Sequence, residues 1–149
     1  MNKTDILNAM QAQGKTDAEQ LRQSAAAGQL TDTQIIDQER KIPDWSHDKD
    51  YSQNPIGTPV ADEGQVYGLL QPHNASYYDG RPATLRALWG LKHTKNPARA
   101  KPYVAPLGTS GLYMKDECCL LDGSVWRSKQ DNNAFSPAEY PEAWELAEV

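Results

Sequence analysis

Long apolar stretches are missing from this sequence, and their absence excludes several classes of protein. No run approaches the roughly 20 apolar residues of a membrane-spanning helix, and the N-terminal stretch MNKTDILNAM lacks the apolar centre of a signal peptide. Only 38% of the 149 residues are hydrophobic, and the mean hydropathy is −0.75. We therefore expect no membrane insertion and a chain that is made in the cytosol and stays soluble. The length suits one ordinary domain or two small ones, without a single large core.

Positive charge is also scarce. The chain has 15 lysines and arginines against 20 acidic residues, which gives a net charge of −5 and an isoelectric point near 5.1. Binding to a phosphate backbone or to an anionic membrane needs a basic surface. We therefore expect no nucleic-acid partner.

Cysteine and histidine are too few for a structural metal site. The two cysteines, Cys118 and Cys119, are adjacent, and neighbouring cysteines almost never meet the geometry of a disulfide. The three histidines are scattered at positions 47, 73 and 93, so the four ligands of a zinc site are not available. Neighbouring side chains of a strand face opposite sides. We therefore expect one thiol in a core and the other outside, with no metal and no cofactor.

Catalytic patterns are likewise absent. The paired acids, Asp48 with Asp50 and Asp62 with Glu63, lie in polar segments with no apolar pocket to raise the pKa of one partner. His73 has no recognisable nucleophile or orienting acid near it in the sequence. We therefore expect a protein that is not an enzyme.

Residues 1–42 differ in composition from the rest of the chain, with no proline, tryptophan or tyrosine. Two stretches match the capping box, in which a threonine and an acid or amide three residues later satisfy free helix amides: Thr16 to Glu19 and Thr31 to Gln34. They predict one helix that Gly28 ends and another from 32 to about 41. A shorter helix is expected near 6–11.

These helices have too few apolar positions to form a core among themselves. We therefore expect residues 1–42 to be an anchoring arm. Its partner is the rest of the chain, a second copy or another protein of an assembly. A partly disordered arm is an equally open alternative.

The stretch LDGSVWRSKQDNNA, residues 121–134, predicts a hairpin, because Asp-Gly favours a tight turn and lies between two short β-prone runs. The stretch DEGQVYGLLQPHNA, residues 62–75, aligns with it at an offset of 59 without a gap. Six positions agree, five as identities and one as an exchange of Tyr67 for Trp126. Both copies end on a tryptophan, Trp89 and Trp144. The pattern predicts a tandem repeat, with chance similarity between two turn-rich stretches as the alternative.

The predicted fold is mainly β with an N-terminal α-helical arm and two small antiparallel β modules. All ten prolines and eight of the ten glycines lie at or after residue 43, mixed with every aromatic residue. The predicted division is an arm at 1–42, a first module at 43–91, a basic linker at 92–102 and a second module at 103–149. Strands are expected near 58–61, 65–70, 111–114, 118–121 and 124–128, and 84–91 is expected to be a helical turn or a short strand.

The second module resembles the small carbohydrate-binding modules of families 5 and 12, which are of the chitin-binding type. The residues that carry this resemblance are Tyr113, Cys118, Cys119, Asp122, Gly123, Val125, Trp126, Ser128, Asp131, Asn133, Pro137 and Trp144. The first module resembles a repeat of phage tail and fibre-associated proteins, in which a glycine-led strand reaches an aromatic residue, then Gln-x-His, and closes on Leu-Trp. The segment 42–45, Ile-Pro-Asp-Trp, resembles the helical lead-in of such proteins.

These resemblances imply a bacteriophage virion protein of the tail, fibre or head decoration, assembled in the host cytoplasm. Its expected partners are other virion proteins, through residues 1–42, and further copies of itself in a homo-oligomer. A bacterial surface glycan is the expected ligand. The alternative is a purely structural capsid decoration or tail accessory protein with no glycan binding. At 68–71 and 127–130, where chitin-binding modules carry exposed aromatics, this chain has none.

A sugar site needs a partly exposed aromatic ring for the C–H face of the sugar and amides or carboxylates for its hydroxyls. Two clusters in the sequence meet this description. In the second module they are Trp126, Asp131, Asn132, Asn133 and Phe135, and in the first they are Tyr67, His73, Asn74, Tyr77 and Tyr78.

Some of these aromatic and amide residues also have structural interpretations. Trp89 and Trp144 are expected in the module cores, and for Tyr67 and Trp126 core and surface stay equally open. Asparagines just after a strand, such as Asn74 and Asn133, most often bond their own backbone in a turn. Tyr77, Tyr78 and Phe135 lie in polar segments and are the best candidates for exposed contacts.

Overall fold

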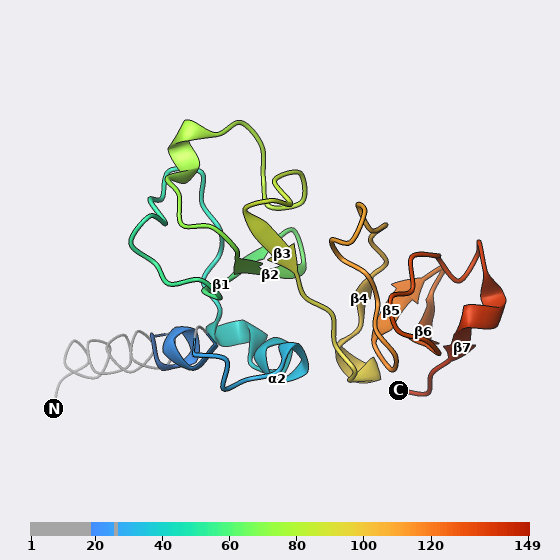
Figure 1. Ribbon diagram of the computed structural model, residues 1–149. Helices are drawn as coiled ribbons and strands as arrows, with labels where there is room; N and C mark the ends of the chain where they lie inside the picture. The colour runs from blue at the N-terminus through green and yellow to red at the C-terminus, as the bar shows by residue number, and fades with distance from the viewer. Residues whose placement is uncertain (1–18, 26) are drawn as a thin grey trace, which may run out of the picture.

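The computed structural model describes residues 19–25 and 27–149, and Figure 1 shows their course. The architecture is mixed, with short helices before two separate β-sheets. The first sheet holds β1 (Pro59–Asp62), β2 (Gln65–Leu69) and β3 (Trp89–Leu91) in that order. The second holds β4 (Lys101–Pro102), β5 (Cys118–Leu121), β6 (Ser124–Ser128) and β7 (Trp144–Leu146). The first eighteen residues of the predicted arm, with the capping box at Thr16, lie outside the described residues. No described helix is long and apolar enough to cross a membrane.

The helix α2 (Asp32–Asp37) begins where the capping box predicts. The Thr31 hydroxyl accepts a hydrogen bond from the Gln34 amide at 3.2 Å, and the Gln34 side chain accepts one from the Thr31 amide at 2.9 Å. Both free amides at the helix start are thereby satisfied. A 3₁₀ helix, Glu39–Lys41, continues the segment toward Pro43. The prediction of a helix from 32 to about 41 is confirmed, with its last turn tightened.

The apolar face of the described arm residues packs against the first sheet. Leu21, Ile35, Ile36 and Ile42 form one buried cluster with Val66 of β2. Four large side chains thus find their core within the chain itself. These side chains therefore share one core with the first sheet.

Polar contacts fasten α2 and the following turn to the stretch between the sheets. Acidic side chains of 32–39 face lysines and amides of 92–101, so the basic stretch is held along its length. The contacts are Lys92 with Asp32 (2.9 Å), the Lys95 amide with the Thr33 hydroxyl (2.9 Å), Asn96 with Asp37 (3.1 Å) and Lys101 with Glu39. These contacts hold the chain against α2 and the following turn where it passes from one sheet to the other (Figure 1).

Loss of the two lysine ion pairs is expected to destabilise the packing of α2 against the stretch between the sheets. In the double variant Lys92→Gln, Lys101→Gln we expect a loss of about 1 kcal/mol in the free energy of unfolding at low salt, because each ion pair is partly screened by solvent. The difference from the unmodified chain is expected to shrink as salt rises. Urea denaturation at two salt concentrations measures it. A difference that does not depend on salt would contradict the electrostatic account, and Lys115→Gln in the second module is the matched control.

Both hairpins form at the predicted turns. In the first, Glu63 and Gly64 have φ of 50° and 79° between the paired residues Asp62 and Gln65. In the second, Asp122 and Gly123 have φ of 53° and 78° between Leu121 and Ser124. Positive φ at two consecutive residues is the requirement of the tight turn that matches strand twist. The prediction of two antiparallel hairpins is confirmed.

The strands that follow the hairpins pair in the same register. Leu69 lies opposite Trp89 in the first sheet, and Ser128, which is 59 residues after Leu69, lies opposite Trp144 in the second. One residue pair beyond each strand, the Lys92 amide donates to the Val66 carbonyl and the Ala147 amide to the Val125 carbonyl, both at 2.9 Å. The first strand of each hairpin also has a parallel neighbour. Asp44 pairs with β1 and Pro102 pairs with β5, at corresponding positions of the two strands. β4 therefore lies within the range predicted as linker.

Each sheet packs its closing tryptophan on a tyrosine. Trp89 is fully buried against Tyr51 at a ring-centroid distance of 5.0 Å, and Trp144 is buried against Tyr113 at 5.2 Å. Each tyrosine hydroxyl accepts a backbone amide from a residue upstream, from Ser46 at 3.1 Å in the first case and from Val104 at 3.3 Å in the second. The prediction that both tryptophans are core residues is confirmed.

The sheets also contact one another directly. The His93 ring stacks on Tyr113 at 3.7 Å, and its Nε2 bonds the Gly111 carbonyl at 2.9 Å. The Gln65 amide of β2 donates to the Pro102 carbonyl of β4 at 3.0 Å. Residues just after β3 thus insert into the second core.

Two local predictions are wrong. Cys118 and Cys119 are both buried. Cys119 belongs to the second core, while the Cys118 thiol on the other face lies 3.5 Å from the Asp116 carbonyl, and Thr94 pairs with Cys118 at the edge of β5. Residues 111–114 form no strand, and only Tyr113 makes an isolated bridge, with Asn133.

Candidate functional site

An exposed pair of aromatic rings stands out in the second module. Phe135 and Tyr140 are 47% and 42% exposed, and their ring centroids are 5.5 Å apart at an interplanar angle of 57°. The two ring planes are therefore inclined to each other rather than coplanar. An exposed pair of this size is a typical anchor for a ligand with an apolar face.

Buried side chains hold the Phe135 backbone on both sides. The Asn133 side chain, which is fully buried, accepts the Phe135 amide at 3.2 Å, and the Trp144 ring nitrogen donates to the Phe135 carbonyl at 3.0 Å. Asn133 is itself fixed, because it donates to the Ser128 hydroxyl and to the Ala143 carbonyl. The Phe135 ring is therefore presented from the rigid core of the module.

A short turn fixes Tyr140. Ser136 and Glu139 each bond the other's amide with a side-chain oxygen, at 3.1 and 3.0 Å. The Tyr140 amide donates to the Ser136 carbonyl, and the Tyr140 carbonyl accepts from Ala143. Both rings thus stand on preorganised backbone, which lowers the entropy lost when a ligand binds.

Polar groups belong to the same loop. Asp131 and Asn132 are exposed, and the Asp131 carboxylate accepts the Lys115 amide at 2.9 Å. Asn132 has a φ of 53°, in the left-handed region that asparagine tolerates better than most residues. Both side chains are exposed in the segment that leads to Phe135, and carboxylate and amide groups are the partners that sugar hydroxyls need.

Trp126 lies on β6 and is half-buried against the second core, with its ring nitrogen 3.4 Å from the Leu121 carbonyl. Trp126 is therefore neither a core residue nor a fully exposed one, but partly buried. Tyr67 is buried in the first core. This difference between aligned aromatics shows that the two modules bury the same position to different depths.

The first module arranges its predicted residues differently. His73 is buried, with its ring 5.4 Å from both Tyr78 and Trp89. The Asn74 side chain accepts the Ser76 amide at 3.0 Å, which confirms the turn predicted for it. Tyr77 and Tyr78 are 82% and 41% exposed, as predicted.

The aromatic pair has no counterpart at the equivalent positions of the first module. The residue 59 positions before Phe135 is Ser76. When β3 is superposed on β7 so that their tryptophans correspond, the residue that corresponds to Tyr140 is Leu85. Leu85 is partly buried against the first core. Among the aligned loops, the exposed aromatic pair therefore occurs only in the second module.

Three of the ten predicted contacts do not fit a ligand site. Tyr67, His73 and Asn133 are buried, so their side chains cannot touch a glycan in this structure. Asn133 acts instead as the internal support of Phe135. Tyr140 was missed, although it shows the same signal that selected Phe135, an aromatic residue in a polar segment.

The two cysteines are not reactive thiols. Burial raises the pKa of the Cys119 thiol to about 12 and that of Cys118 above its usual range, so neither thiol forms a ready nucleophile. No group of three histidine, cysteine or acidic side chains within the described ranges is arranged to hold a metal ion. The candidate site is a contact surface.

No protein-family model matches the chain, and no characterised protein matches it at a significant level. The resemblance to carbohydrate-binding modules therefore rests on the quoted motifs alone.

Proposed function

We propose that this chain is a non-enzymatic component of a bacteriophage virion that attaches through its N-terminal arm and displays two β modules for recognition of bacterial surface glycans. The Phe135–Tyr140 pair of the second module is the principal contact. Asp131 and Asn132 supply partners for sugar hydroxyls, and Tyr77 and Tyr78 provide a secondary aromatic surface in the first module.

We also propose that the two modules are tandem copies of one unit. The hairpin turns agree at an offset of 59, and the closing strands with their tryptophans pair in the same register at an offset of 55. The amide of Ser76 bonds Asn74, and the amide of Phe135 bonds Asn133, also at the offset of 59. Agreement of strand register and turn hydrogen bonds adds to the argument from the six aligned residues, because it extends the correspondence to residues that are not identical.

Exposure of the aromatics is the observation that carries the recognition function. A protein whose modules only held a fold together would bury its rings in cores. Here both rings are exposed, and the buried side chains of Asn133 and Trp144 hold the backbone of Phe135 by hydrogen bonds. A rigid, exposed aromatic pair with carboxylate and amide neighbours matches what a sugar ring requires.

Affinity per site is expected to be weak, and several copies in a homo-oligomer compensate for this. Linked sites gain avidity without new contacts when the geometry allows them to bind together. The virion supplies such a linkage through the arm. Because Leu21, Ile35, Ile36 and Ile42 belong to the core of the first module, attachment to other virion proteins falls to the residues before 19.

The recognition function predicts a clean separation of binding from folding. Replacement of Phe135 and Tyr140 by alanine in the full chain is expected to weaken binding to a bacterial surface polysaccharide by about tenfold or more, because stacking on aromatics contributes on the order of 1–2 kcal/mol. The loss of stability is expected to stay small, since both rings are exposed. Biolayer interferometry and thermal melting measure the two effects, and Leu107→Ala, at an exposed side chain outside the proposed contacts, is the matched control.

Two results would favour the structural alternative, a capsid decoration or tail accessory protein. One is no binding of the unmodified chain to any polysaccharide of the host surface. The other is a collapse of stability in the Phe135→Ala, Tyr140→Ala variant, which would reassign the pair to packing.

A further inference from the structure

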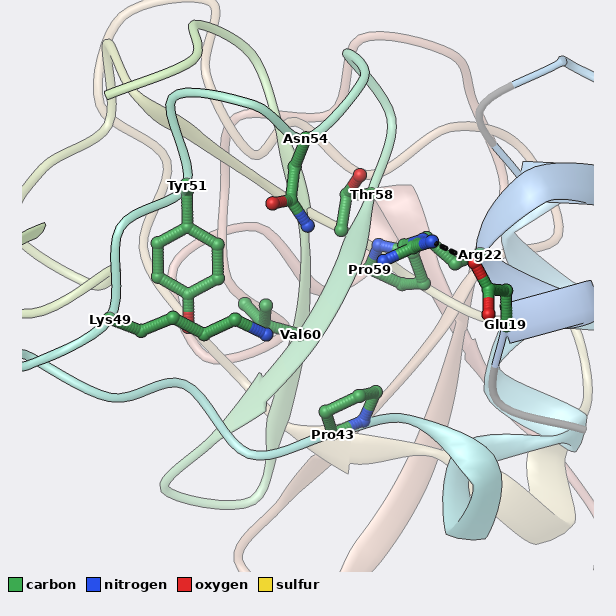
Figure 2. Close-up of a pocket in the computed structure, with 9 residues that line it drawn as sticks. All are labelled: Glu19, Arg22, Pro43, Lys49, Tyr51, Asn54, Thr58, Pro59 and Val60. Carbon is green, nitrogen blue, oxygen red and sulfur yellow. Dashed lines mark hydrogen bonds and ion pairs between the residues drawn. The ribbon is translucent and has the colours of Figure 1, made fainter. Parts of the chain in front are cut away.

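A cavity lies between the helix at 19–25 and the first module, away from the aromatic pair of the second module. It has a volume of about 300 Å³, and Figure 2 shows the side chains that line it. One wall is the helix at 19–25, the other is the loop before β1, and the start of β1 forms the floor. The volume is at the lower end of the range for small-molecule sites. The lining residues are Glu19, Arg22, Pro43, Lys49, Tyr51, Asn54, Thr58, Pro59 and Val60.

The charge of this cavity is opposite to that of the chain. Arg22 and Lys49 contribute two positive charges and Glu19 one negative charge, so the net charge is +1 (2 − 1) in a chain of net −5. Arg22 is paired with Glu19 at 2.7 Å. Lys49 takes part in no ion pair among the described residues. Its ammonium lies 5.2 Å from the centre of the Tyr51 ring. The site therefore has one positive charge without a partner among the described residues and suits a single anionic group.

The remaining lining is divided between polar and apolar groups. Asn54 and Thr58 offer an amide and a hydroxyl, and the Thr58 hydroxyl already donates to the Pro55 carbonyl at 2.7 Å, which leaves it an acceptor for a ligand hydroxyl. Pro43 offers an exposed apolar surface, whereas Pro59 and Val60 line the cavity as buried residues, and in Figure 2 the Lys49 side chain extends toward Val60. An inorganic anion would leave the apolar surface unused, and a fatty acid would leave Asn54 and Thr58 unused.

The loop that carries these groups is held in place. The Tyr51 amide donates to the His73 carbonyl at 2.8 Å, and the Lys49 carbonyl accepts the Ala75 amide at 3.1 Å. The Tyr51 hydroxyl accepts the Ser46 amide. The cavity wall is therefore preformed, which reduces the cost of ordering on binding.

We propose that this cavity binds a sugar carboxylate, a single uronic-acid unit, with its carboxylate between Lys49 and Arg22. The sugar hydroxyls pair with Asn54, Thr58 and Glu19, and the C–H face lies on the exposed ring of Pro43. Galacturonate and glucuronate share this chemistry and differ in the direction of one hydroxyl. This site goes beyond the aromatic pair of the second module and does not depend on it.

Isothermal titration calorimetry of the full chain with galacturonate and with glucuronate tests the proposal, with galactose, glucose and acetate as comparison ligands. We expect at least one uronate to bind at concentrations up to roughly 10 mM, where a complex with a Kd near 1 mM is largely formed. Its affinity is expected to exceed that of the neutral sugars and of acetate by about tenfold, because a charge-assisted bond and the ring contacts act together.

The variant Lys49→Gln is expected to weaken uronate binding by about tenfold, whereas the exposed control Lys115→Gln leaves it unchanged. Phe135→Ala is also expected to leave it unchanged, which separates this site from the aromatic pair. Three results would overturn the proposal: no uronate binding, binding no tighter than acetate, or an unchanged affinity in a folded Lys49→Gln variant.

Discussion

Replacement of Trp89 by alanine is expected to lower the free energy of unfolding by about 3–5 kcal/mol. The ring is fully buried and contacts Tyr51 at 5.0 Å and His73 at 5.4 Å, so its removal leaves a cavity that a small module cannot close. Most single domains have a total stability of only about 5–15 kcal/mol. The first module is therefore expected to lose much of its folded population.

Urea denaturation followed by far-ultraviolet circular dichroism measures this loss. Tyr77→Ala removes a ring that is 82% exposed and is the matched control, with an expected change within about 0.5 kcal/mol. Equal costs for the two substitutions would contradict the assignment of Trp89 to the centre of the first core.

Acid is expected to destabilise the protein through His93. Burial lowers the pKa of His93 from 6.5 to about 4, and the ring is stacked on Tyr113 with its Nε2–H donating to the Gly111 carbonyl. The unfolded chain therefore binds a proton between pH 6.5 and 4 that the folded chain does not. The stability lost through this group develops as pH falls through that window, and it amounts to about 2–3 kcal/mol at pH 4.5.

Comparison of unfolding free energies at pH 7 and pH 4.5 tests this effect. His93→Gln is expected to show a smaller loss between the two pH values than the unmodified chain, whatever its stability at pH 7. Burial raises the pKa of Glu117, so this carboxyl acts in the opposite direction at low pH and does not account for the loss. His47→Gln, at an exposed histidine, is expected to behave like the unmodified chain. Equal losses in His93→Gln and the unmodified chain would contradict the account.

Local signals in the sequence predicted the local structure well. Thr31 with Gln34 marked the start of α2, and Asp122-Gly123 marked a hairpin turn, because caps and tight turns are determined by a few neighbouring residues. The alignment at an offset of 59 predicted a hairpin at Glu63-Gly64 as well, and the tryptophan that ends each copy marked a core residue. Both turns and both core tryptophans are where the sequence placed them.

Contacts between distant segments could not be predicted in the same way. Cys118 is buried where Thr94 pairs with the edge of β5, and His73 is buried against Tyr51 and Trp89. These neighbours are distant in the sequence, so alternation along a strand gave the wrong exposure for Cys118. The supporting role of Asn133 behind Phe135 likewise depends on Trp144 and Ala143, which only the fold brings together.

Saturation-transfer difference NMR on the full chain, with oligosaccharides released from the host surface polysaccharide, tests the central claim most directly. The account predicts transfer to the C–H protons of the sugar, and a strong reduction of that transfer in the folded Phe135→Ala, Tyr140→Ala variant. Undiminished transfer in that variant, at an unchanged melting temperature, would contradict the claim that this exposed pair is the principal glycan contact.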